Sequence, residues 1–182
     1  LNPPTNLLQN PSFEQAAAGN EEQARNWSQY QCGYTRTRER SYAPDIDGPW
    51  RCRLTGAGKD GEMGYGGTST AVGDLPAQGT FAATNSIYIA SYTQGSVYGL
   101  YVTMGYDDGS QKNASFTLTD AQIKDNLGKW KTYRQVFSSD PQKKLKTITF
   151  WCLVWKKGEQ KFIGTVYFDA LELRQVHTAA PG

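Results

Sequence analysis

Apolar side chains recur at every second position through the second half of the chain, and this spacing constrains the fold most. In residues 147–155, Ile148 and Phe150 share one side, and Trp151 and Trp155 share the other. Successive side chains of a β-strand point to opposite faces, so the pattern predicts a strand with one face in the core. Similar alternation predicts further strands at residues 97–106, 130–138 and 164–173. In the first of these, the alternation puts Tyr98 on the core face together with Leu100.

The first half of the chain predicts shorter strands. Leu7-Leu8 and Phe13 suggest a broken first strand. The other candidates are residues 27–42, 50–54, 68–72 and 85–92. The one helix-like stretch is residues 120–127, which follow a cap at Thr119 or Asp120 and end at Gly128. About ten short strands separated by turns predict an all-β sandwich or barrel.

Length and charge narrow the class of protein. The 182 residues suit one domain, which we place at 1–176, with 177–182 as a C-terminal linker or tail. Both chain ends have the composition of linkers around an excised domain. The net charge of +2 is too small to indicate a nucleic-acid partner. No apolar run approaches the about 20 residues of a membrane helix, so we expect no membrane partner.

The three cysteines leave at least one thiol unpaired. Cys152 lies in an apolar run and is expected to be a buried thiol. Cys32 and Cys52 either form a disulfide or are two more buried thiols, and the sequence leaves both open. No Cys/His cluster with the spacing of a zinc site is present.

Two terminal motifs carry a family resemblance. Residues 6–14 read NLLQNPSFE and are followed by Trp27, and residues 166–173 read VYFDALEL. Residues 67–76 and 130–137 fit the same layout. This combination resembles the carbohydrate-binding modules of families 4, 9, 16 and 22, which are galactose-binding-like β-jelly-rolls. The resemblance implies a two-sheet antiparallel β-sandwich with a concave sheet face.

The resemblance also implies a structural Ca²⁺ where the first and last strands meet. Glu14 and Asp169 match that metal site. Calcium takes several oxygen ligands, some of them backbone carbonyls, so these carboxylates are chemically suitable. The alternative is that Glu14 is a solvated turn residue and that Asp169 caps a bulge.

Aromatic side chains outside the core provide candidate sugar-binding residues. A flat ring stacks on the apolar side of a pyranose, and planar polar groups bind its hydroxyls. The period of two sends Trp151 and Trp155 away from the core, and Tyr101 points outward on a strand that neighbours Trp151 in the resembled fold. The alternative is that a loop covers Trp151 and forms a second small core. Trp155 is close to a turn and can instead rim the site.

Two further aromatic residues flank the glycine-rich stretch at 56–64. Trp50 and Tyr65 either wall a binding cleft or form a hydrophobic lid on the end of the sandwich. Trp27, Trp130 and Phe137 are expected in the core.

Arginines alternate in two short segments and suggest a possible anionic ligand. They are Arg36, Arg38, Arg40, Arg51 and Arg53. Residues i and i+2 of a strand share a face, so five guanidinium groups can line one surface. Arg38 is our representative candidate for binding an acidic polysaccharide through carboxylates or sulfates. The alternative is a solvated outer face paired with Glu39, Asp45 and Asp47, so the charge of the glycan stays open.

These features predict a non-catalytic carbohydrate-binding module that docks a secreted or cell-surface polysaccharide-active enzyme onto its glycan. The expected partners are a polysaccharide and the attached catalytic domain. One alternative is a jelly-roll lyase that acts on uronate polymers with Tyr and Arg, because the one histidine, His177, is in the tail. Another alternative is an adhesive sandwich domain that binds protein.

Overall fold

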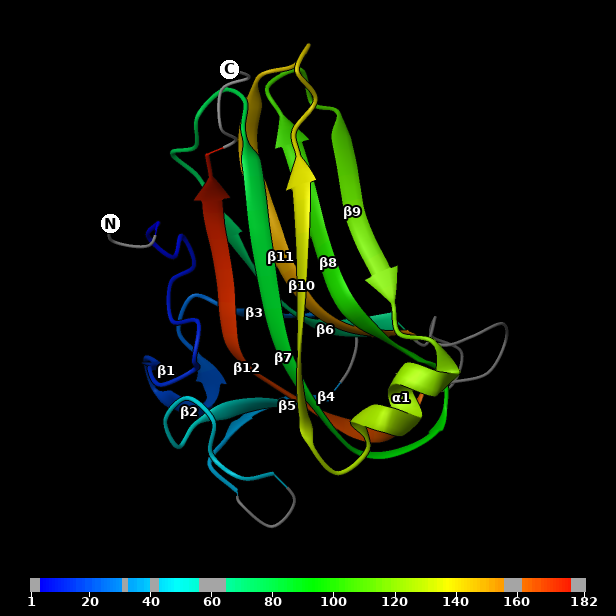
Figure 1. Cartoon of the computed structure of the whole chain (residues 1–182). Coiled ribbons are helices and arrows are strands. Elements are labelled where there is room, and N and C mark those ends of the chain that lie inside the picture. Colours follow the sequence, from blue (N-terminus) through cyan, green and yellow to red (C-terminus); the bar gives the residue numbers. More distant parts are fainter. Residues whose placement is uncertain (1–3, 31–32, 40–42, 56–64, 156–161, 178–182) are drawn as a thin grey trace.

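The chain folds into two antiparallel sheets of five strands each, packed face to face, with one short helix (Figure 1). This computed structural model describes residues 4–30, 33–39, 43–55, 65–155 and 162–177. The predicted two-sheet antiparallel β-sandwich is therefore confirmed. The elements are β1 (Ala16–Ala17), β2 (Asn20–Ala24), β3 (Ser28–Tyr30), β4 (Gly33–Thr37), β5 (Arg51–Thr55), β6 (Tyr65–Val72), β7 (Thr80–Gln94), β8 (Ser96–Tyr106), β9 (Gln111–Thr117), α1 (Asp120–Asn126), β10 (Trp130–Ser138), β11 (Leu145–Trp155) and β12 (Ile163–Val176).

Each sheet is named here by its central strand. The β11 sheet has the order β3-β6-β11-β8-β9, and the β12 sheet has the order β10-β7-β12-β5-β4. Strands β1 and β2 form a separate small hairpin. In Figure 1, β10, β7 and β12 lie in one layer, and β11, β8 and β9 lie in the other.

The core lies between the two sheets. Ile148, Phe150 and Val154 of β11 are buried there, as the alternation predicts. Trp27 and Phe137 also belong to this core, and the Trp27 ring packs 5.0 Å from the Phe13 ring. Side chains at the intervening positions of β11 therefore face away from the core.

Trp130 lies outside this core, contrary to expectation. Its ring is half-buried on the outer face of the β12 sheet, 5.6 Å from the Tyr88 ring. A second small cluster forms there, where Ala43 covers Tyr88 and Tyr167. The Trp130 Nε1–H donates to the Pro44 carbonyl at 2.9 Å, which satisfies the polar end of the indole.

The predicted helical stretch forms the helix α1. The Thr119 hydroxyl accepts from the Gln122 N–H, and the Gln122 side chain accepts from the Thr119 N–H. This reciprocal capping box satisfies two backbone donors at the first turn. Among the described residues, no helix is long and apolar enough to cross a membrane.

The two terminal motifs lie side by side. The Leu7 N–H donates to the Leu173 carbonyl at 2.8 Å, and the Leu171 N–H donates to Pro11. Asn6 joins the same two elements through its amide, which donates to the Leu171 carbonyl and accepts from the Leu173 N–H. The residues that suggested a family resemblance therefore close the sandwich together.

Candidate functional site

Trp151 lies on the outer face of the β11 sheet and is half-buried there. In the strand register it stands between Ser69 of β6 and Tyr101 of β8. Its ring is 6.5 Å from the Tyr101 ring, almost perpendicular to it, and 5.8 Å from the Tyr30 ring on its other side. The strand parity predicted from the sequence thus brings Trp151 and Tyr101 together.

A β-bulge adds a fourth ring that the sequence analysis placed on the wrong face. The pairing of β8 with β11 and β9 shifts around Gly99, which has no register partner on β9. A bulge of one residue reverses the alternation of the strand. Tyr98 and Leu100 consequently face opposite sides, and the Tyr98 ring lies 5.2 Å from Tyr101.

Trp155 continues the aromatic surface along β11. Its ring lies 6.4 Å from the Tyr98 ring. Leu153, between the two tryptophans of β11, has no exposed surface although it is outside the main core cluster. The backbone of Tyr65 pairs directly with Trp155 at this end of the sheet. We call the rings of Tyr30, Trp151, Tyr101, Tyr98 and Trp155 the aromatic row.

Polar side chains surround the aromatic row. Ser69 pairs with Trp151, and Ser115 of β9 pairs with Tyr101. The Thr103 hydroxyl donates to the Asn113 amide oxygen at 2.9 Å. Ser115 and Asn113 are exposed, so their hydroxyl and amide groups reach solvent beside the rings. The face combines stacking surfaces with uncharged hydrogen-bonding groups.

Two polar groups of the row are poorly solvated. The Nε1–H of Trp151 is buried and has no hydrogen-bond partner. A buried donor without a partner costs about 1–3 kcal/mol, and such groups are uncommon away from functional sites. Burial, with a smaller effect from Tyr101, raises the pKa of the Tyr98 hydroxyl, so Tyr98 is neutral at physiological pH.

Trp50 and Arg38 lie apart from the aromatic row, beside the β4–β5 edge of the β12 sheet. The Trp50 ring stacks on the Arg36 guanidinium, whose Cζ is 3.5 Å from the ring centroid. The Arg38 Cζ is 5.5 Å from the same ring. The backbone N–H of Trp50 donates to Glu14 Oε1 at 3.1 Å. The structure therefore joins Trp50 to the N-terminal segment and does not place it with Trp151.

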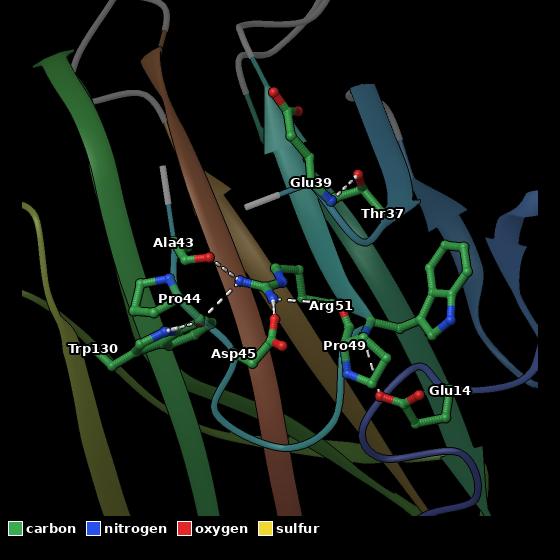
Figure 2. Close-up of polar contacts among 10 residues, drawn as sticks. Glu14, Thr37, Glu39, Ala43, Pro44, Asp45, Pro49, Arg51 and Trp130 are labelled. Atoms are coloured by element: carbon green, nitrogen blue, oxygen red, sulfur yellow. Dashed lines mark hydrogen bonds and ion pairs between the residues drawn. The ribbon is translucent and has the colours of Figure 1, made fainter. Parts of the chain in front are cut away.

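Arg51 is wholly buried on the outer face of the β12 sheet. Figure 2 shows its guanidinium surrounded by the carbonyls of Ala43, Pro44 and Pro49 and by the Asp45 carboxylate. A guanidinium with this many acceptors holds the loop from Ala43 to Pro49 on the sheet and does not reach a ligand.

The arginines do not line a single surface. Arg36 pairs with Cys52 in the register, whereas Arg51 pairs with Thr37, so Arg36 and Arg51 face opposite sides of the sheet. Arg36 is buried and donates to the carbonyls of Phe13, Glu14 and Glu21. Arg53 pairs with Glu39 at 2.8 Å. The five-arginine surface is therefore wrong. Arg53 and Arg51 do pair with Glu39 and Asp45, as the alternative expected, but Arg51 is wholly buried and not part of a solvated face.

Asp169 lies at the junction of the two terminal motifs, near the negative charges of Asp47 and Glu14. The Asp169 carboxyl is wholly buried, with Oδ1 accepting from the Ala170 N–H at 2.8 Å and Oδ2 without a partner. The pKa of Asp169 is raised to about 8, mainly by burial and to a lesser extent by the negative charges of Asp47 and Glu14, while the Ala170 hydrogen bond and Arg51 oppose this rise. A cation beside Oδ2 would relieve both effects.

Two features of this site therefore suit calcium: its negative charge and the unpartnered Oδ2 of Asp169. Asp169, Glu14 and Asp47 supply hard oxygen atoms, which Ca²⁺ prefers. Among the residues that the structure describes, however, no three acidic, Cys or His side chains are already arranged around one metal position. The calcium site remains a prediction from the resemblance and from the buried carboxylate.

Some expectations fall on residues outside the described ranges. These are Cys32, Arg40 and the glycine-rich stretch at 56–64. Cys52 and Cys152 are both buried in the core, and burial raises the pKa of the Cys152 thiol. Whether Cys32 and Cys52 form a disulfide stays open.

Comparison with known proteins shows that this chain is similar to solved structures in its fold alone. No protein-family model and no curated protein matches the sequence. Among solved structures, the family 22 xylan-binding domain of Paenibacillus barcinonensis Xyn10C has a TM-score of 0.62 at 16% identity and covers 98% of this chain and 99% of its own. A family 61 module bound to β-1,4-galactotriose has a TM-score of 0.55 at 14% identity and covers 94% of this chain and 99% of its own.

A third match is part of a larger protein. The enzymatically active domain of bacteriophage CBA120 tailspike protein 4 has a TM-score of 0.63 at 11% identity. The match covers 94% of this chain but 21% of that one. Two matches named as carbohydrate-binding modules extend over nearly all of both chains, so the resemblance read from the terminal motifs is confirmed at the level of the fold: this chain has the sandwich of the carbohydrate-binding modules.

Proposed function

We propose that this domain is a non-catalytic carbohydrate-binding module whose ligand stacks on the aromatic row. One observation carries the proposal. Five aromatic rings from β3, β8 and β11 lie next to one another on the side of the β11 sheet that points away from the core, with three of the four ring pairs edge to face and the Tyr98–Trp155 pair tilted. Large aromatic clusters outside the core usually bind something, and a pyranose offers a matching apolar face.

The row is carried by hydrogen-bonded strands of one sheet and so needs little rearrangement to bind. A rigid platform lowers the entropic cost of association. Its open shape buries little ligand surface, and sugars give up well-hydrated hydroxyls, so we expect weak binding of each domain. The benefit to a parent protein is a higher local concentration of an attached catalytic domain on its polysaccharide.

The parent protein is proposed to be a secreted or cell-surface polysaccharide-active enzyme. The support comes from the similar folds: a xylan-binding domain of Xyn10C and a module bound to galactotriose. This chain's attachment to such an enzyme, its location and its lack of catalytic activity belong to the proposal.

Affinity gel electrophoresis against a panel of soluble polysaccharides tests the function. At least one polysaccharide should retard the domain, and Trp151→Ala should abolish that retardation, because it removes the ring that lies between Tyr30 and Tyr101. Trp130→Ala is the matched control, since it removes a half-buried tryptophan from the outer face of the opposite sheet.

Both variants must keep a cooperative thermal transition for the comparison to hold. Retardation of Trp151→Ala equal to that of the wild type would place the ligand elsewhere. An absence of retardation across the panel, with no ligand-induced change in tryptophan fluorescence, would rule out the module and favour a protein-binding domain.

We also propose that Ca²⁺ binds where the terminal motifs meet. Asp169, Glu14 and Asp47 would supply carboxylate oxygens, and the ion would stabilise the junction of the N-terminal segment with β12. The support is the unpartnered Asp169 Oδ2 and the nearby negative charges. This ion would have a structural role, because the aromatic row and Asp169 lie on different sheets.

A further inference from the structure

We propose that a pocket at one end of the sandwich binds a neutral sugar unit, either a free small saccharide or the end of a glycan chain. The pocket has a volume of about 440 Å³, which is within the range of small-molecule sites. It lies where β7 begins and where β10 and β12 end, and Figure 1 shows the tips of β10 and β12 at the same end of the molecule. This site is separate from the aromatic row, so the inference goes beyond the proposed function.

Two turns that border the pocket hold each other in place. The Ser139 N–H donates to the Gly79 carbonyl at 2.9 Å, and the Gly79 N–H donates to the Ser139 hydroxyl at 3.0 Å. The Gln78 side chain donates to the Pro141 carbonyl. These bonds join the turn before β7 to the turn after β10, so the pocket keeps its shape without a ligand and needs little ordering when one binds.

Amide and hydroxyl groups in the pocket are available to a ligand. Among the described residues, the Gln175 side chain has no hydrogen-bond partner, and its Nε2 would be 3.5 Å from a Cβ at Gly79. The glycine therefore leaves open space beside this amide. A carboxamide presents a donor and an acceptor side by side, which suits two neighbouring hydroxyls of a pyranose. The Thr80 and Ser138 hydroxyls, 2.8 Å apart, bind each other and keep further lone pairs for a ligand.

The lining favours an uncharged ligand that is rich in hydroxyl groups. Among the described residues that line the pocket, none is Asp, Glu, Lys or Arg. A carboxylate or sulfate would lose its water there without gaining a charged partner, whereas a sugar hydroxyl exchanges water for hydrogen bonds to neutral groups. The rings of Pro141 and His177 add surface for the C–H groups of the sugar.

The pocket is too far from the aromatic row for one sugar unit to fill both. Strand β11 begins at Leu145, just after the turn that contains Pro141, and reaches Trp151 further along the sheet. At about 3.4 Å per residue, Trp151 is roughly 20 Å from that end of β11. The strands that border the pocket belong to the β12 sheet, whereas the row lies on the β11 sheet. The domain would therefore bind two separate glycan segments.

Binding in the pocket is expected to be weak. A few hydrogen bonds between neutral groups add little to those that they replace in water, so we expect a dissociation constant in the millimolar range. A long polysaccharide presents few chain ends, and the pocket alone should not retard the domain in a gel. Gel retardation, and its loss in Trp151→Ala, therefore report on the aromatic row.

Nuclear magnetic resonance titration of the isotope-labelled domain tests the inference. The probes are glucose, galactose and xylose, together with β-1,4-xylotriose and β-1,4-galactotriose. At least one probe should shift the side-chain amide signals of Gln78 and Gln175 along a saturable curve. Trp151→Ala should show the same shifts with the same dissociation constant, because binding in the pocket does not need the row.

Two glutamine variants locate the site. Gln175→Ala should weaken binding roughly fivefold, the effect of losing one hydrogen bond between neutral groups, as measured on the Gln78 signals. It should leave the response of the Trp151 indole to the oligosaccharides unchanged. Gln142→Ala is the matched control, because Gln142 is exposed in the turn after β10 and is not among the residues that line the pocket.

Three results would overturn the inference. They are the absence of a saturable shift at Gln78 and Gln175 with every probe, wild-type affinity in Gln175→Ala, and loss of the shifts in a folded Trp151→Ala variant, which would make the pocket an extension of the row. None of them affects binding at the row, which the Trp151 indole signal reports separately. Conversely, shifts at the pocket with no retardation by any polysaccharide would reject the proposed function and leave this inference standing.

Discussion

Asp169 is the residue whose protonation most affects the stability of the metal-free fold. Its carboxyl has a pKa near 3.8 when exposed, and burial raises that pKa to about 8 in the folded chain. Between these values, the folded state holds a proton that the unfolded state has lost. The free energy of unfolding therefore falls as pH rises through this window, by at most about 1.4 kcal/mol per pH unit.

We predict that Asp169→Asn removes this contribution and also removes the response to calcium. In a chelator, the wild type should lose stability between about pH 4 and pH 8, and Asp169→Asn should be less sensitive to pH over that range. Added Ca²⁺ should raise the melting temperature of the wild type at pH 8 and leave that of Asp169→Asn unchanged. Differential scanning calorimetry measures both effects.

The half-buried Asp140 provides a control for the loss of one carboxylate. Asp140→Asn should retain both the pH dependence and the calcium response of the wild type, since Asp140 lies in the turn between β10 and β11 and is not among the groups that shift the pKa of Asp169. An equal calcium effect in wild type and Asp169→Asn would show that the ion, if bound, has other ligands.

At the scale of single elements, alternation predicted the outward face of β11 correctly and that of β8 only in part. Trp151 and Tyr101 follow the period of two, so their orientation was readable from the sequence. Tyr98 was placed in the core because the bulge at Gly99 was not recognised. An isolated glycine inside a strand signals a bulge, and this signal was present. Tyr30 gave no comparable signal because β3 has three residues and no alternation to count.

Gly99 is expected to hold both the bulge and the aromatic row in place. A Cβ at Gly99 would lie 2.2 Å from Phe116 Cε2 and 2.9 Å from Leu118 Cδ2. We predict that Gly99→Ala lowers the free energy of unfolding by about 1–3 kcal/mol through overpacking and weakens sugar binding by moving Tyr98. Urea denaturation and calorimetry with the preferred glycan measure the two effects.

Gly73→Ala is the matched control, because nothing lies within 4 Å of a Cβ at that position. It should change neither stability nor affinity by a measurable amount. If Gly99→Ala binds the glycan with wild-type affinity despite its lower stability, Tyr98 is not part of the binding surface.

At the scale of the whole molecule, the sequence predicted the sandwich because local alternation and the two terminal motifs agree. The arrangement of loops over the sheets was less predictable. Arg51 and Trp130 were read from local spacing alone, yet both are fixed by the segment from Ala43 to Pro49, which crosses the outside of the β12 sheet. Such contacts depend on where a loop folds back, and the spacing of side chains within a strand does not encode this.

Besides the backbone hydrogen bonds between the two terminal motifs, the side chain of a single asparagine links them. Asn6 donates to the Leu171 carbonyl at 2.9 Å and accepts from the N–H groups of Leu173 and Leu8 at 3.1 and 3.2 Å. The two bonds to Leu171 and Leu173 link parts of the chain that are 165 or more residues apart. Without them, buried or half-buried backbone groups of β12 lose their partners.

We predict that Asn6→Ala lowers the free energy of unfolding by about 1–3 kcal/mol, the cost of leaving such groups unsatisfied. The urea midpoint should fall while the m-value stays constant, since the surface exposed on unfolding hardly changes. Sugar affinity should be unaffected at temperatures where the variant is folded, because Asn6 contacts β12 and not the aromatic row. Asn20→Ala, at an exposed position of β2, removes an asparagine without these bonds and should leave the midpoint close to that of the wild type. A wild-type midpoint for Asn6→Ala would mean that the N-terminal segment contributes little to closing the sandwich.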